Sequence, residues 1–91
     1  MPDVLQARLT IAPDALFQDV EGEIVILYQD QYFSLVDVGA RVWAWIAAHG
    51  ELDGLLAALL KEYEIDEATL RLDVANLLDQ MVAEGLVVME T

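Results

Sequence analysis

The hydrophobic pattern of this chain changes its period once, close to Leu35, and that change restricts the folds open to it. Before Leu35 the chain consists of three short apolar runs, ALFQDV, EIVILY and YFSL, which Glu21-Gly22 and residues 29–31 separate. Short runs with turn residues between them predict a three-stranded antiparallel meander. The central run is apolar at five consecutive positions, so we expect it to be covered on both faces or paired at both edges.

After Leu35 the apolar residues recur at steps of three and four, which predicts three helices. The predicted bounds are a first helix capped by Asp37 and ended by Gly50, a second from about Asp53 to Tyr63, and a third capped by Asp66 and ended by Gly85. The buried stripes are predicted to contain Val38, Val42, Trp43 and Ile46, then Leu55, Leu56, Leu59 and Leu60, then Leu70, Val74, Leu77, Leu78 and Met81. Residues 86–89 can return as a short terminal strand.

This order of elements predicts an α+β fold of the winged helix-turn-helix type. A length of 91 residues, of which 57% are hydrophobic, is sufficient for one small domain, so we expect residues 1–91 to form a single domain. Within it, the stretch ARLTI, which Pro13 ends, is a candidate for an extra strand, and the alternative for residues 1–13 is a flexible segment. The chain has no cysteine, no signal-peptide core and no apolar run long enough to cross a bilayer, which predicts a soluble cytoplasmic protein.

The charge of the chain excludes the function that a winged helix most often suggests, which is reading DNA. Seventeen acidic residues against four basic ones give a formal charge of −13, and a polyanion would be repelled over most of the surface. The third predicted helix, which would enter the major groove, carries one cation, Arg71, among four carboxylates. We therefore expect no nucleic-acid partner and no membrane partner, and we interpret the charge mainly as a solubilising surface.

No arrangement of side chains points to catalysis, a metal or a cofactor. The single histidine, His49, ends the first predicted helix, where it is expected to complement exposed carbonyl groups. No nucleophile is placed to pair with it, and no second ligand follows at a metal-binding spacing. The chain is therefore predicted to be a binding module without cofactor.

Several motifs, taken in their order, resemble one family of binding modules. They are the aromatic-rich YFSL strand, the run GARVW, a leucine-rich helix ending in KEYEID, and the ending EGLVV. In this order and spacing they resemble the PqqD-like family, the RiPP recognition elements, over residues 15–89. The chain departs from the family pattern at Val36-Asp37, where many members resemble Leu-Asn.

The resemblance implies both a mechanism and a set of binding residues. In such domains the leader peptide of a ribosomal precursor adds as a strand to the third strand of the sheet, and its side chains enter a groove beside the third helix. An edge strand leaves backbone donors and acceptors unpaired, which an extended peptide can complete. The residues implied for peptide binding are Tyr32, Phe33, Ser34, Leu35, Arg71, Val74, Leu77, Leu78 and Met81.

Some of these side chains have competing roles that the sequence leaves open. Most of the apolar residues of the third helix must belong to the core, and the sequence does not say which of them line the groove. Arg71 could hold a leader carboxylate or bond locally to Asp66 or Glu67. Trp43 follows the helical stripe and is predicted to be core, whereas Trp45 points elsewhere and is a candidate contact residue.

The functional hypothesis is non-catalytic recognition of a leader peptide and its delivery to a maturation enzyme, such as a leader peptidase, in lasso-peptide biosynthesis. One alternative is a peptide carrier in pyrroloquinoline quinone or radical-enzyme peptide modification. Another is a winged-helix regulator, or a structural module that pairs the YFSL edge with its own copy. The chain is expected to be a monomer or a weak homodimer.

Overall fold

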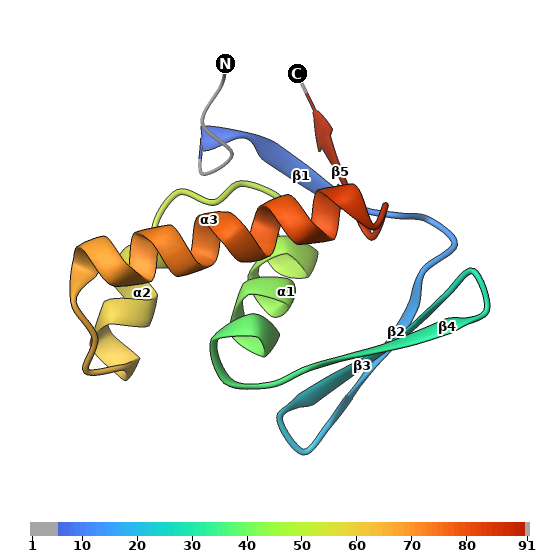
Figure 1. Cartoon of the computed structure of the whole chain (residues 1–91), viewed down its shortest axis with the longest axis horizontal. Coiled ribbons are helices and arrows are strands. Elements are labelled where there is room, and N and C mark those ends of the chain that lie inside the picture. The colour runs from blue at the N-terminus through green and yellow to red at the C-terminus, as the bar shows by residue number, and fades with distance from the viewer. Residues whose placement is uncertain (1–5, 91) are drawn as a thin grey trace.

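The computed structural model describes residues 6–90, and within that range the chain forms two small antiparallel sheets and three helices (Figure 1). The strands are β1 (Arg8–Ile11), β2 (Leu16–Val20), β3 (Glu23–Tyr28), β4 (Gln31–Leu35) and β5 (Val87–Glu90). The helices are α1 (Asp37–His49), α2 (Leu55–Glu62) and α3 (Glu67–Ala83).

The predicted meander is present as a sheet of order β2-β3-β4. The central strand β3 is paired at both edges, which accounts for its continuous apolar run. Both of its connections are two-residue turns with positive φ at each position, 55° and 89° at Glu21 and Gly22, and 51° and 63° at Gln29 and Asp30. These values match the turns that favour hairpins, because their twist agrees with that of the strands. The second turn is one residue shorter than expected, since Gln31 already belongs to β4.

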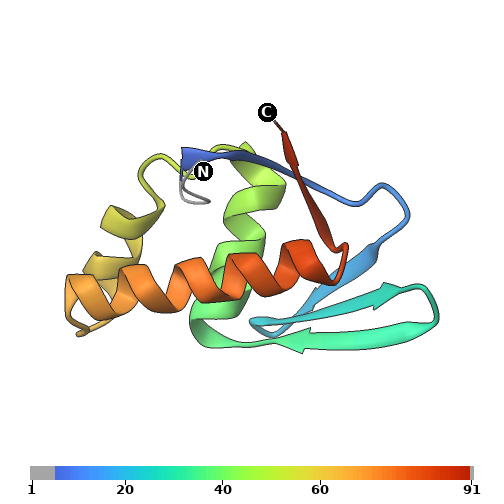
Figure 2. The same ribbon diagram turned by 45° about the horizontal axis from the view of Figure 1, so that its top comes forward.

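The extra strand predicted in ARLTI is β1, and it pairs antiparallel with the terminal strand β5. Leu9 lies opposite Met89, and Thr10 donates its hydroxyl hydrogen to Glu90 at 2.6 Å. Residues 1–5 lie outside the described residues, so the alternative of a flexible N-terminal segment is not tested there. The two-stranded sheet lies on the opposite side of α3 from the β2-β3-β4 sheet (Figures 1 and 2).

Four residues were named at helix ends, and the structure confirms Gly50, Asp66 and Gly85, the last of which follows the C-cap of α3 with φ of 79°. Gly50 ends α1 with φ of 73°, and its N–H donates to the carbonyl of Ile46 at 2.9 Å. The Asp66 carboxylate caps α3 by accepting from the N–H of Thr69 at 3.1 Å. Asp37 does not cap α1: Val36 occupies the cap position, and Asp37 is the first helical residue, with φ of 53°. No side-chain hydrogen bond caps the first turn of α1, and the chain enters the helix through the positive φ of Asp37.

The positive φ of Asp37 leads to a stability prediction. Asp37→Val is expected to lower the free energy of unfolding by at least about 1 kcal/mol, because a β-branched residue is strained in this region. Asp37→Gly is expected to be neutral or to stabilise by up to about 1 kcal/mol. Urea denaturation measures both, and Ala44→Val, at an exposed position of the same helix, controls for the low helix propensity of valine. Equal losses for the two valine variants would contradict the strain.

The core lies where α1 meets both α3, which crosses it, and the inner face of the sheet (Figure 2). Trp43 is fully buried, as predicted, and the ring of Phe17 packs edge-on against it at a centroid distance of 5.3 Å. Trp45 is half-buried rather than free: its indole N–H donates to the carbonyl of Glu51 at 2.8 Å, and its ring lies 4.5 Å from that of His49. Trp45 therefore stabilises the loop that follows α1 through this hydrogen bond to Glu51. None of the described helices is long and apolar enough to span a membrane.

Candidate functional site

Strand β4 forms one edge of the three-stranded sheet, and its backbone groups face alternately toward β3 and away from it. The two-residue turn makes Tyr28 and Gln31 the closing, hydrogen-bonded pair, and such pairs alternate along an antiparallel ladder. The N–H groups of Phe33 and Leu35 therefore point toward β3, whereas those of Tyr32 and Ser34 point outward. No backbone hydrogen bond to another described residue satisfies these two outward N–H groups.

The pairing of β3 with β2 supports this assignment independently. The turn at Glu21-Gly22 makes Val20 and Glu23 a closing pair, so residues 23, 25 and 27 bond to β2. Residues 24, 26 and 28 are then left to bond to β4, opposite residues 35, 33 and 31. The two ladders use alternate residues of β3, as a central strand requires.

The side chains of β4 also alternate, and they divide the strand into an inner and an outer row. Phe33 and Leu35 lie opposite the buried Ile26 and Ile24 and are themselves half-buried. Tyr32 and Ser34 form the outer row, where Tyr32 is 75% exposed. The Ser34 hydroxyl donates to the carboxylate of Glu23 on the neighbouring strand.

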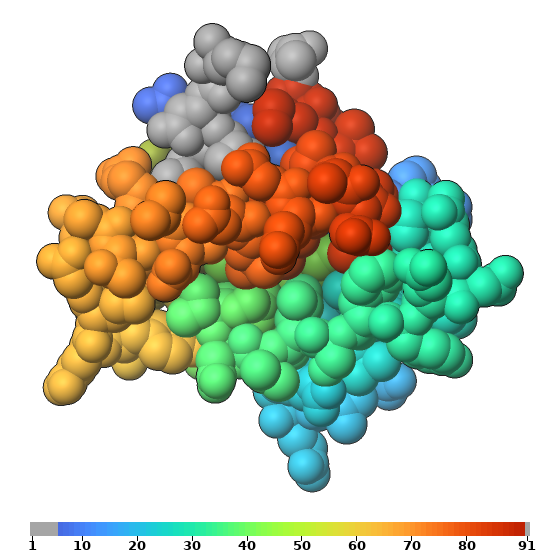
Figure 3. Space-filling model, viewed as in Figure 1, coloured from blue at the N-terminus to red at the C-terminus, as the bar shows by residue number. Residues whose placement is uncertain are grey.

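The inner row of β4 continues into α3 through a close approach at Gly39. A β-carbon placed on Gly39 would lie 3.5 Å from Cδ2 of Leu35 and 3.8 Å from Cδ2 of Leu77. We call this line of residues the β4–α3 seam; it consists of the apolar side chains of Phe33, Leu35 and Leu77 and of Gly39 between the two leucines. In the space-filling view, residues of β4 lie beside the C-terminal half of α3 on one face of the molecule (Figure 3).

The structure separates the predicted α3 residues into a buried stripe and its borders. Val74, Leu78 and Met81 are at most 2% exposed, as is Leu70, so they form the core, and a bound peptide could not touch them without moving their neighbours. Their proposed place in the groove is therefore corrected to a place in the core. Leu77 is half-buried and borders the seam.

Arg71 lies on the other border of the buried stripe. At about 100° per residue, the six steps from Arg71 to Leu77 place the two side chains about 120° apart around the helix. Arg71 is exposed, and no ion pair joins it to Asp66, Glu67 or any other described residue. The residues that do flank Leu77 on its solvent side are Asp73 and Gln80, which we did not predict. On a helical projection Leu77 lies at one border of the stripe formed by Leu70, Val74, Leu78 and Met81. This position could have identified Asp73 and Gln80 as its neighbours on the solvent side.

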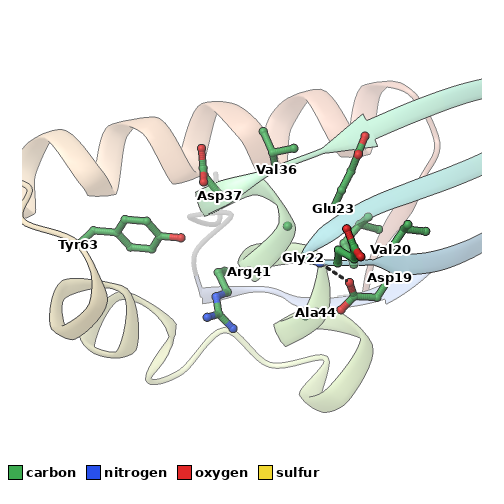
Figure 4. Close-up of a pocket in the computed structure, with 12 residues that line it drawn as sticks. Asp19, Val20, Gly22, Glu23, Val36, Asp37, Arg41, Ala44 and Tyr63 are labelled. Carbon is green, nitrogen blue, oxygen red and sulfur yellow. Dashed lines mark hydrogen bonds between the residues drawn. The ribbon is translucent and has the colours of Figure 1, made fainter.

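A hollow of about 590 Å³ lies apart from the seam, between the β2–β3 turn and α1 (Figure 4). Its lining includes the carboxylates Asp19, Glu21, Glu23 and Asp37. Arg41 lines the same hollow and pairs with Glu62 at 3.1 Å. Among the described residues no group of three or more histidine, aspartate or glutamate side chains is arranged to hold a metal ion.

These features define a class of protein: an α+β winged helix-turn-helix domain whose sheet ends in an open strand edge beside the third helix. Residues 23–87 match the model of the family described as coenzyme PQQ synthesis protein D (PqqD), and the chain belongs to that family. The resemblance found in the sequence is thus confirmed.

One solved structure extends the comparison to three dimensions. It is described as TbiB1 in complex with the TbiA(beta) leader peptide, and it is 24% identical to this chain with a TM-score of 0.79. The alignment covers 86% of this chain and 93% of that chain, which confirms the predicted fold over nearly its whole length. A search of curated proteins finds no match.

Proposed function

We propose that this chain is a non-catalytic module that binds the leader peptide of a ribosomal precursor by strand addition to β4. The observation that carries this proposal is the pair of outward N–H groups at Tyr32 and Ser34 on the open edge. A peptide that pairs there completes these groups with main-chain hydrogen bonds. Membership of the PqqD family and the likeness to a structure that contains a leader peptide support it.

The seam supplies the side-chain contacts that strand addition needs. Residues of an added strand that lie beside Phe33 and Leu35 project their side chains to the same face as these two. There they would meet Leu77, which is half-buried and next to Leu35 around Gly39. Main-chain bonds would thus provide affinity, and the alternate side chains would provide selectivity.

We further propose that the bound leader is delivered to a separate maturation enzyme, such as a leader peptidase. The outer face of the sheet supports a protein partner, because Leu16, Val20 and Tyr32 are 66%, 47% and 75% exposed there. An added leader strand would extend this same face beyond Tyr32. Lasso-peptide biosynthesis is the setting we prefer, and the family description makes coenzyme PQQ synthesis the alternative.

A DNA-binding role has little support from the surface of α3. Arg71 is the one cation of that helix, and its exposed neighbours include Glu67 and Asp79. A duplex would therefore meet carboxylates where it needs several basic side chains.

Titration with leader peptides of precursors encoded beside this protein tests the proposal. Backbone amide shifts measured by NMR are expected to be largest for residues 32–35 of β4, followed by Gly39 and Leu77 at the seam. The amides of α2 are expected to move little and serve as the internal control. Shifts concentrated on α2, or saturable binding that leaves Tyr32 and Ser34 unmoved, would contradict strand addition. Concentration-dependent β4 shifts without peptide would favour pairing of two copies instead.

A further inference from the structure

The solvent side of the β4–α3 seam carries two carboxylates, Asp73 on α3 and Glu84 at its C-cap. Asp73 precedes Leu77 by four residues and Glu84 follows it by seven, so both lie within about 40° of Leu77 around the helix. Gln80 lies between them in the same row, and all three side chains are exposed. A peptide in the seam would therefore have the two carboxylates of this row beside its groove-facing side chains.

The basic residues of the chain lie away from this row. Arg8 pairs with Glu51 at 2.8 Å on the opposite sheet, and Arg41 pairs with Glu62. Lys61 belongs to α2, and Arg71 lies on the far border of the buried stripe. Nothing cationic among the described residues of α3 is therefore placed to neutralise Asp73 and Glu84 from within the row.

We propose that the peptide bound along β4 carries lysine or arginine at two groove-facing positions four residues apart, which Asp73 and Glu84 recognise. This inference rests on the proposed function and names the class of peptide that it selects. The apolar seam and the open edge would provide most of the affinity. The carboxylates of Asp73 and Glu84 would select, among peptides that fit the seam, those with basic side chains. A net charge of −13 would also attract cationic peptides from a distance.

The spacing follows from the geometry of the two elements. The eleven residues from Asp73 to Glu84 correspond to about 16 Å along a helix that rises about 1.5 Å per residue. An extended strand rises about 3.4 Å per residue, so about five residues cover the same length. Side chains on one face of a strand recur at even steps. A step of four residues spans about 14 Å, which is the even step closest to the roughly 16 Å between Asp73 and Glu84. Lysine and arginine side chains are long enough to make up the remaining difference.

A displayed library of random 12-residue peptides, selected on this protein in about 0.15 M salt, tests the inference without assuming a leader sequence. Counter-selection on Ser34→Pro keeps peptides that need the β4 edge. Each retained peptide is then synthesised with lysine, glutamine or glutamate at the two positions that the register assigns. The lysine form is expected to bind three- to tenfold more tightly than the glutamine form, because each exposed charge pair contributes about 1.4- to 5-fold.

Three charge reversals on α3 separate recognition from general attraction. Asp73→Lys and Glu84→Lys are each expected to abolish or reverse the preference for lysine at the nearer position. Asp79→Lys makes the same change of charge about 160° away from Leu77 and is expected to leave the preference within twofold. An unchanged preference in Asp73→Lys and Glu84→Lys, or an equal loss in all three variants, would overturn the inference.

The two levels of the proposal fail in different ways. Peptides that depend on the Ser34 edge but bind equally as lysine, glutamine and glutamate forms would refute the charge selection and leave strand addition intact. If every binder of the library is lost in the counter-selection, because it binds Ser34→Pro as tightly as the parent protein, strand addition is refuted, and the charge inference with it.

Discussion

Replacing Ser34 by proline is expected to weaken the binding of a leader peptide by about 5- to 150-fold while the domain stays folded. The N–H that proline removes points away from β3, so no hydrogen bond of the β3–β4 ladder is lost. The peptide loses one main-chain bond, its own carbonyl is left unsatisfied, and the ring of proline projects toward it. These effects cost about 1–3 kcal/mol together, and about 1.4 kcal/mol corresponds to a factor of ten.

The matched control for this experiment is Ser34→Ala. Alanine removes the hydroxyl that donates to Glu23 but keeps the backbone N–H, so the affinity is expected to stay within about twofold of the parent value. Phe33→Pro is not a suitable control, because the N–H of Phe33 points toward Ile26 and its ring packs against the core. Isothermal titration gives the affinities, and circular dichroism shows that each variant is folded. Full affinity in a folded Ser34→Pro variant would rule out pairing at this edge.

Replacing Trp43 by alanine is expected to lower the free energy of unfolding by about 3–5 kcal/mol. Trp43 is fully buried between α1 and the inner face of the sheet, where it contacts Phe17. Its removal leaves a cavity that the surrounding helices and strands can close only in part. Small domains have a total stability of about 5–15 kcal/mol, so this variant can be partly unfolded at room temperature. Urea denaturation followed by circular dichroism measures the loss.

Trp43→Phe provides a sharper comparison at the same position. The indole N–H of Trp43 is buried without a hydrogen-bond partner among the described residues. Phenylalanine keeps much of the apolar volume and removes that unsatisfied group, so the expected loss is at most about half that of alanine. Leader affinity of the folded fraction should stay close to the parent value in both variants. A Trp43→Ala protein that unfolds like the parent but fails to bind would place Trp43 at the binding surface instead.

Much of the fold could be predicted from the sequence because it depends on local periodicity. The alternation and turn residues of residues 15–35 predicted the meander, and the three- and four-residue steps after Leu35 predicted the helices. Trp43 belonged to its core stripe for the same reason, since a helix places residues three and four apart on one face. The terminal strand was also foreseen, but its pairing with β1 joins opposite ends of the chain, and no local pattern encodes a partner so distant.

The candidate site also has a part that local sequence patterns predicted and a part that only packing decided. The sequence predicted the strand that forms the open edge, because the edge needs only the order of three consecutive strands and their turns. Only the tertiary structure decided which face of α3 lies beside the β4 edge. The helical repeat gives the order of residues around the helix axis, but it does not say which border of the buried stripe lies next to β4. Leu35 and Leu77 both lie close to Gly39, and this shared neighbour gives the orientation of the helix. It assigns Val74, Leu78 and Met81 to the core, puts Arg71 on the far border and brings Asp73 beside the seam, because packing of α3 on α1 and β4 selects one rotation of the helix.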